Sequence, residues 1–150
     1  MRVALGSDHA ALDMKNALLA HLTGKGCDTT VFAPENEADS RDYPFYAEKA
    51  AEAITGGSCD MGILLCGTGA GMCIAANKVP GIRAVNCSEA FTARLAKEHN
   101  DANVLCIGAR VVAWEVAEMI VDTWLEARFQ GERHARRVAL IEDIEKKYRK

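Results

Sequence analysis

Five short apolar runs, separated by stretches with helical spacing, constrain the fold of this chain more than any other feature. They lie at 3–6, 29–33, 62–66, 82–87 and 104–107. Short apolar runs of this kind are typical of strands in a parallel sheet that is covered on both faces. The alternation predicts an α/β fold, a three-layer αβα Rossmann-like sandwich around a five-stranded parallel sheet.

The stretches between the runs place apolar residues three or four positions apart, which indicates amphipathic helices. We expect helices at about 12–22, 46–54, 72–77, 89–98 and 114–129, and a last one at about 132–148. A chain of 150 residues can bury a substantial core. We therefore predict one domain that spans residues 1–150.

Composition argues against several classes of function. Net charge is −3, so the chain has no overall excess of basic residues that would bind nucleic acid or an anionic membrane. No apolar stretch approaches the ~18 residues of a membrane span, and no signal peptide precedes the first strand. The six cysteines include no C-x-x-C pair, so zinc and thioredoxin-like sites lack their spacing. We expect a cytoplasmic protein without a metal site.

Polar segments follow four of the predicted strands and form the candidate site. In a doubly wound sheet, ligands bind beyond the carboxyl ends of the strands. The segments are Ser7-Asp8-His9, Cys66 with the glycines after it, Ser88-Glu89 and Gly108-Ala109-Arg110.

The segment from Cys66 to Gly71 reads Cys-Gly-Thr-Gly-Ala-Gly and joins an apolar run to a helical stretch. Such a turn aims backbone N–H groups at one point, where an anion is stabilised. A dinucleotide fingerprint is the alternative, with Glu89 about 20 residues on as the ribose-binding acid. Met72 stands where that fingerprint has its last glycine, so a phosphate or oxyanion cradle is favoured.

Cys66 is either a buried structural thiol or a base or nucleophile beside that cradle. Its position at the strand end favours the second interpretation. Asp8 or Ser7 could cap the first helix next to His9, and His99 could belong to a polar turn. Because both histidines have hydrogen-bonding neighbours at the ends of elements, a functional role is favoured for the pair.

Arg133 and Arg137 share one face of the last predicted helix, within a basic cluster of an acidic protein. A solvated surface is one interpretation, and bidentate binding of a phosphate is the other. Arg110 could join them. Convergent arginines together with an anion cradle imply a small phosphorylated or otherwise anionic substrate.

Taken together, these motifs resemble ribose-5-phosphate isomerase type B, of the family that also holds galactose-6-phosphate and allose-6-phosphate isomerases. The resemblance runs nearly end to end, and it rests on linked motifs at 6–9, 42–44, 62–71, 75–78, 81–84, 99–101 and 133–137. It implies an aldose–ketose isomerase that interconverts ribose 5-phosphate and ribulose 5-phosphate through an enediolate. It also implies that no metal or organic cofactor takes part.

The resemblance further implies roles for individual residues. Cys66 is the base that shuttles a proton between C1 and C2, and His99 opens the sugar ring with help from Thr68 and Asp8. The backbone of residues 67 to 71 holds the enediolate oxygens. The substrate-binding residues are Gly67, Gly69, Ala70 and Gly71 in the loop, Arg133, Arg137 and His9 for the phosphate, and Tyr43, Asn100 and Arg110 along the walls.

Members of the family form homodimers with shared active sites, so we expect His99 and Asn100 to come from the partner chain. The helix at about 132–148 is expected to contribute to the dimer, and pairing of dimers into tetramers stays open. Another branch of the family has a glutamate base at the position of Met72. Because methionine cannot take a proton, this chain is expected to use Cys66.

Two alternatives stay open. One is an isomerase of another sugar phosphate, such as allose 6-phosphate or a tetrose phosphate, because the loop at 34–42 gives no guidance on sugar length. The other is a non-catalytic sugar-phosphate-binding module that uses the same cradle. A competent base in the cradle distinguishes an enzyme from such a module.

Overall fold

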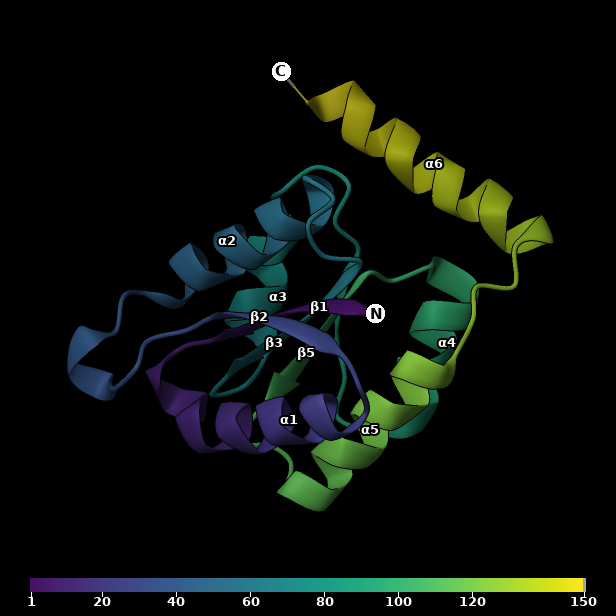
Figure 1. Ribbon diagram of the computed structural model, residues 1–150. Coiled ribbons are helices and arrows are strands. Elements are labelled where there is room, and N and C mark those ends of the chain that lie inside the picture. The colour runs from purple at the N-terminus through teal and green to yellow at the C-terminus, as the bar shows by residue number, and fades with distance from the viewer. Residues whose placement is uncertain (150) are drawn as a thin grey trace.

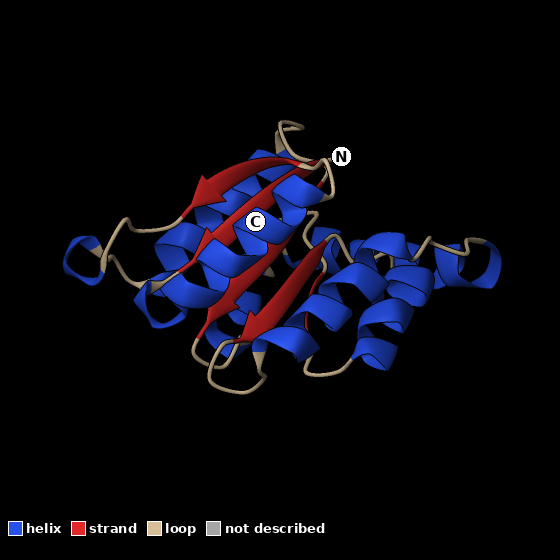
Figure 2. Cartoon of the chain, turned by 60° about the horizontal axis from the view of Figure 1, so that its bottom comes forward, coloured by secondary structure: helices blue, strands red, loops and turns tan. Residues whose placement is uncertain are grey.

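The computed structural model describes residues 1–149 and shows one parallel sheet with helices on both sides (Figure 1, Figure 2). The strands are β1 (Arg2–Ser7), β2 (Asp28–Phe32), β3 (Met61–Cys66), β4 (Ala84–Asn86) and β5 (Val104–Gly108). Their order is β2-β1-β3-β5-β4, and each neighbouring pair is parallel. The predicted α/β fold with a five-stranded parallel sheet is confirmed.

The register of the central strands decides which loops meet. Ser7 pairs with Leu65, and Cys66 pairs with Gly108. The last residues of β1, β3 and β5 therefore lie side by side along one border of the sheet, which we call the carboxyl edge. The opposite border, where β3 and β5 begin, is the amino edge. Both strands are almost wholly buried because helices cover the two faces of the sheet.

Two layers of helices enclose the sheet. On one face, α1 (Leu12–Gly24), α4 (Ala90–Asn100) and α5 (Trp114–Glu126) share a core with β1, β3 and β5. On the other face, α2 (Tyr43–Thr55) and α3 (Ala70–Ala76) pack through small side chains such as Ala47, Ala50 and Ala76. Short 3-10 turns, His9–Ala11 and Glu37–Asp39, precede α1 and α2. The two cores lie on opposite faces of the sheet, which confirms the expected αβα sandwich.

Helix α5 is shorter than the sequence pattern predicts. It ends at Glu126, and Ala127 is extended with ψ 150°, so the expected helix over 127–129 is wrong. The guanidinium of Arg128 donates to the carbonyl oxygens of Leu125, Glu126 and Ala127, all within 3.1 Å. These bonds satisfy carbonyls that lack partners at a helix end, which makes an early stop favourable.

Helix α6 (Glu132–Tyr148) extends away from the layered body (Figure 1) and confirms the helix expected at about 132–148. Its buried residues are His134 and Val138. Further along, Leu140 and Ile144 are 57% and 60% exposed. Apolar side chains on an otherwise charged helix mark a surface suited to a partner. Within residues 1–149, no helix is long and apolar enough to cross a membrane.

Candidate active site

Most of the predicted site residues meet at the carboxyl edge. Cys66 is the last residue of β3, and Asp8 follows the end of β1 beside it. The amide of Asp8 donates to the carbonyl oxygen of Leu65 at 3.2 Å, which ties the two strand ends together. Arg110 follows β5, and its amide donates to the carbonyl oxygen of Gly67 at 3.0 Å. Sheet register, rather than sequence proximity, brings these three segments to one place.

The glycine loop folds back on the Cys66 thiol. Cys66 is only 5% exposed, and the amide of Gly69 donates to its Sγ at 3.1 Å. The next amide, of Ala70, donates to Thr68 Oγ1 at 3.4 Å. Gly69 has φ +79°, a left-handed conformation that favours glycine, and this sharp turn folds the loop back toward Cys66. One backbone N–H group thus donates to the sulfur, and the next donates to the Thr68 hydroxyl within the same turn.

The loop is clamped by its neighbours. A Cβ at Gly108 would lie 2.6 Å from the carbonyl carbon of Thr68, so only glycine allows β5 to approach this closely. On the other side, Asn86 Nδ2 donates to the carbonyl oxygen of Thr68 at 3.2 Å. Sequence reasoning counted Asn86 within an apolar run and missed it. The signal available was an amide side chain at the end of a strand, facing the same edge as the loop.

Asp8 has the capping role that the sequence allowed. Its side chain is 7% exposed, and Oδ1 accepts the amide of Ala10 at 2.9 Å at the start of the 3-10 turn. This bond fixes the backbone that carries His9, whose side chain points outward and has Nδ1 3.5 Å from Ser40 Oγ. Tyr43 lies across the loop, because a Cβ at Gly71 would come within 2.9 Å of its ring.

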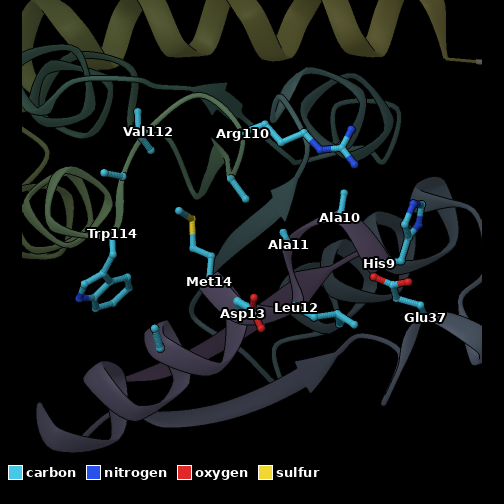
Figure 3. Close-up of a pocket in the computed structure, with 13 residues that line it drawn as sticks. His9, Ala10, Ala11, Leu12, Asp13, Met14, Glu37, Arg110, Val112 and Trp114 are labelled. Atoms are coloured by element: carbon cyan, nitrogen blue, oxygen red, sulfur yellow. The ribbon is translucent and has the colours of Figure 1, made fainter.

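Two cavities open beside these residues. The larger, about 640 Å³, lies between the first turn of α1 and the segment after β5, with His9 and Arg110 on its wall and Trp114 at the far end (Figure 3). The smaller, about 380 Å³, is lined by Asp8, His9 and Tyr43 among others. His9 borders both, and Cys66 lines neither. The thiol thus sits beneath the loop, next to the cavities rather than inside them.

Four predicted site residues lie elsewhere, at the amino edge. Helix α4 runs back across the sheet, so its last residues, His99 and Asn100, lie where β4 and β5 begin. The carbonyl oxygen of Asn100 accepts Arg83 Nε at 3.2 Å, one residue before β4. Arg133 and Arg137 are exposed on the first turns of α6, which packs against α4. We call this group, together with His134, the α4–α6 corner.

His134 joins the two helices of that corner. Its imidazole stacks on that of His99, with ring centroids 4.1 Å apart and an angle of 7° between the planes. Arg133 Nε donates to His134 Nε2 at 3.4 Å. Burial lowers the pKa of His134, and the nearby charges of His99, Arg133 and Arg137 lower it further. Sequence reasoning assigned His134 no role beyond its membership of the basic cluster.

The dinucleotide interpretation finds no support at Glu89. Its side chain is the N-cap of α4, where Oε1 accepts the amide of Thr92 at 2.8 Å. That bond lowers the pKa of Glu89 and keeps the carboxylate at the helix end. Among residues 1–149, no three His, Cys, Asp or Glu side chains gather in a way that could hold a metal ion.

Comparison with known proteins agrees with the fold and with the motifs. Residues 3–141 match the Ribose/Galactose Isomerase family. The chain is 47% identical to ribose-5-phosphate isomerase B of Escherichia coli over 97% of both chains. It is 43% identical to D-erythrulose-4-phosphate isomerase of Pectobacterium atrosepticum, covering 94% of this chain and 93% of that one.

A solved structure, Clostridium thermocellum ribose-5-phosphate isomerase B, superposes with a TM-score of 0.96 at 50% identity over 99% of both chains. The match therefore covers nearly the whole length of both chains. The chain therefore belongs to the ribose/galactose isomerase family, and it is an aldose–ketose isomerase of sugar phosphates.

Proposed function

We propose that the protein interconverts ribose 5-phosphate and ribulose 5-phosphate, with Cys66 as the proton-shuttling base. One observation carries the proposal. Cys66 is the last residue of the central strand β3, and the amide of Gly69, in the loop that follows, donates to the Cys66 sulfur. Ribose-5-phosphate isomerase B of E. coli is 47% identical to this chain, which supports the choice of the pentose phosphate.

The chemistry requires a base and a stabilised anion. Cys66, as a thiolate, takes the proton from C2 of the aldose and returns it to C1, while a hydroxyl proton moves from O2 to O1. The enediolate that forms in between carries negative charge on its oxygens. In the proposed mechanism, backbone N–H groups of Gly67, Gly69, Ala70 and Gly71 stabilise that charge, and losing one such donor costs roughly 10²–10³ in rate.

The remaining functional groups need a second chain. Within one chain, Cys66 and the α4–α6 corner lie at opposite edges of the sheet, so His99, Asn100, Arg133 and Arg137 cannot join Cys66 in one site. A homodimer that places the corner of one chain over the carboxyl edge of the other would complete the site. The exposed apolar residues Leu140, Ile141 and Ile144 on α6 support this helix as part of the contact.

In that dimer, His99 opens the furanose ring, assisted by Thr68 and Asp8 of the other chain. Arg133 and Arg137 bind the phosphate together with His9, and Asn100, Arg110 and Tyr43 line the site. Phosphate binding far from the reacting carbons supplies energy for positioning. The six cysteines are all free thiols, which suits a reducing compartment such as the cytoplasm.

A second candidate substrate is a four-carbon sugar phosphate. The D-erythrulose-4-phosphate isomerase of P. atrosepticum is 43% identical to this chain, so the same scaffold accommodates a shorter sugar in a relative. The alternative of a non-catalytic binding module is set aside, because the chain belongs to an isomerase family.

The experiment that tests the proposal measures kcat/KM for ribose 5-phosphate, allose 6-phosphate and erythrose 4-phosphate. Ribose 5-phosphate is expected to give the highest value. In the Cys66→Ala variant, kcat should fall by about 10²–10⁴-fold, while the Kd for 5-phosphoribonate, an open-chain acid with the same phosphate, stays nearly unchanged.

Cys27→Ala, which removes a half-buried thiol before β2, is the matched control and should keep full activity. A higher kcat/KM for another sugar phosphate would reassign the substrate. Full turnover by Cys66→Ala would remove the thiol from the mechanism.

A further inference from the structure

The stacked pair of His99 and His134 joins α4 to α6, the helix that carries the arginines proposed to bind the phosphate. The two rings are nearly parallel, 7° apart, with centroids separated by 4.1 Å. His134 is 4% exposed, whereas Arg133 and Arg137 on either side of it are exposed. A flat face buried against His99 restricts the orientation of that imidazole, because ring rotation would break the stack.

His134 meets His99 as a neutral ring. Arginine can only donate, so the bond from Arg133 Nε requires a lone pair on His134 Nε2. Burial, and the charges of His99, Arg133 and Arg137, lower the pKa of His134, while Glu132 opposes them weakly. Two stacked imidazoles cannot easily both be charged at this separation. The bond from Arg133 and the stack on His99 together hold the His134 ring in one orientation.

His134 also anchors α6. It and Val138 are the buried residues of that helix within the described chain, and the His134 amide donates to the carbonyl oxygen of Gly131 at 2.9 Å in its first turn. Gly131 has φ +67°, which sets the direction in which the helix leaves α5. One side chain thus joins the histidine at the end of α4 to the helix that presents Arg133 and Arg137.

We infer that His134 is a positioning residue, which holds the His99 imidazole by stacking so that it can transfer a proton during opening of the sugar ring. The inference rests on the proposed function, in which His99 opens the ring. It assigns to His134 an effect on ring opening that is separate from phosphate binding. Catalysis by a general acid depends on its alignment with the receiving oxygen, so loss of alignment lowers the rate without removing the acid.

Sugar chemistry separates ring opening from the other steps. Ribose 5-phosphate closes a furanose ring through O4, and this ring must open before isomerisation. In erythrose 4-phosphate the phosphate occupies O4, so a five-membered ring cannot form. A residue that acts only on ring opening should affect the pentose phosphate and leave the tetrose phosphate nearly untouched.

The test compares the wild-type protein with His134→Leu, which removes the stack, and with His134→Phe, which keeps a flat ring but no nitrogen. For ribose 5-phosphate, His134→Leu should lower kcat by about 10–100-fold with little change in KM. His134→Phe should restore kcat to within about threefold of the wild type, because stacking is retained. The kcat/KM for erythrose 4-phosphate should change by less than about threefold in both variants.

A second measurement tests whether the substitutions at His134 displace α6. The Kd for 5-phosphoribonate, which has no ring to open, should stay the same in all three proteins. A Kd that rises by the same factor as kcat/KM falls would show that His134 only anchors α6, and it would overturn the inference. Equal loss on both substrates, no loss in His134→Leu, or His134→Phe behaving like His134→Leu would also overturn it.

The wild-type rates separate this inference from the proposed function. A wild-type protein that does not turn over ribose 5-phosphate refutes the proposed function and the inference with it. A wild-type protein that does so, with variants that leave the ratio between the two substrates unchanged, refutes only the role of His134.

Discussion

At the carboxyl edge, the groups around Cys66 are mostly backbone atoms, whereas at the α4–α6 corner they are side chains that project from two helices. The loop after Cys66 is fixed by the Gly69 amide, by the close approach of Gly108, and by the bond from Asn86. At the corner, the side chains of His99 and His134 stack on each other. Arg133 and Arg137 extend from it into solvent.

This difference matches the two tasks that the proposed mechanism requires. Charge that develops in a transition state is stabilised best by donors that are already in place, and a clamped backbone loop provides them. Phosphate is bound by long charged side chains, which can adapt to their ligand. Substitutions at the carboxyl edge should therefore lower kcat. Substitutions at the corner should lower kcat at the histidines and raise KM at the arginines.

The largest expected effect tests whether the two regions act together across a dimer. Cys66→Ala and His99→Ala should each lower kcat for ribose 5-phosphate by about 10²–10⁴-fold. When the two inactive chains are refolded as an equal mixture, half of the dimers pair the two variants, and each contains one intact site. Activity should return to about a quarter of the wild type, measured as isomerisation of ribose 5-phosphate.

Each variant refolded alone provides the control and should stay inactive. An equal mixture that regains no activity would show that the corner of one chain does not complete the carboxyl edge of another.

A smaller but clear effect is expected at Gly108. The methyl group of Gly108→Ala would lie 2.6 Å from the Thr68 carbonyl carbon, so the loop after Cys66 must shift. A displacement of this kind is expected to lower kcat by about 100-fold and the free energy of unfolding by about 1–3 kcal/mol. Kinetics and urea denaturation measure the two effects.

Gly24→Ala is the matched control, because no atom lies within 4 Å of a Cβ at that helix end. It should leave kcat unchanged and alter stability by less than about 1 kcal/mol. If Gly108→Ala behaves like Gly24→Ala, the clamp on the loop is not required.

Arg137→Ala is expected to act on binding. One charge-assisted bond to phosphate contributes about 1.5–3 kcal/mol, so KM for ribose 5-phosphate should rise roughly tenfold or more while kcat changes little. Lys147→Ala, in the last turn of the same helix, is the control and should leave KM as it is. A fall in kcat at constant KM would place Arg137 in the chemistry instead.

The smallest expected effect is on the pH dependence of stability. The folded protein holds the pKa of His134 below its ordinary value of 6.5, so the unfolded chain binds more protons between the two values. Stability from this group is therefore complete above about pH 6.5 and decreases as the pH falls toward the folded pKa. The urea midpoint of the wild type should drop more between about pH 7.5 and 5.5 than that of His134→Phe. An equal drop in both proteins would contradict a neutral, buried His134.

Much of the fold could be predicted because it depends on local patterns. Apolar runs located the strands, and helix spacing located the helices to within a few residues at most ends. Asp8 or Ser7 could cap the first helix by sequence, and the structure has Asp8 as the cap of the 3-10 turn that precedes α1. The end of α5 was wrong by three residues, because the apolar pattern continues through Phe129 while Arg128 bonds the last carbonyls.

Parts of the site could not be predicted because they depend on contacts between distant segments. The placement of β5 between β3 and β4 brings Gly108 against Thr68, and no local pattern indicates that approach. Asn86 contacts the loop only because β4 ends at the same edge. His134 stacks on His99 across 35 positions of sequence, through a helix pair whose packing only the folded chain specifies.

The sequence by itself determined the α/β class, the position of Cys66 at a strand end and the glycine loop beside it, because strands and tight turns follow from local residue types. The tertiary structure decided how these parts are distributed. A helix that follows a parallel strand must run back across the sheet, so α4 carries His99 and Asn100 to the amino edge, away from Cys66. The packing of α6 on α4 then gathers the arginines beside His99 as one group, which the proposed dimer would bring to the thiol of the other chain.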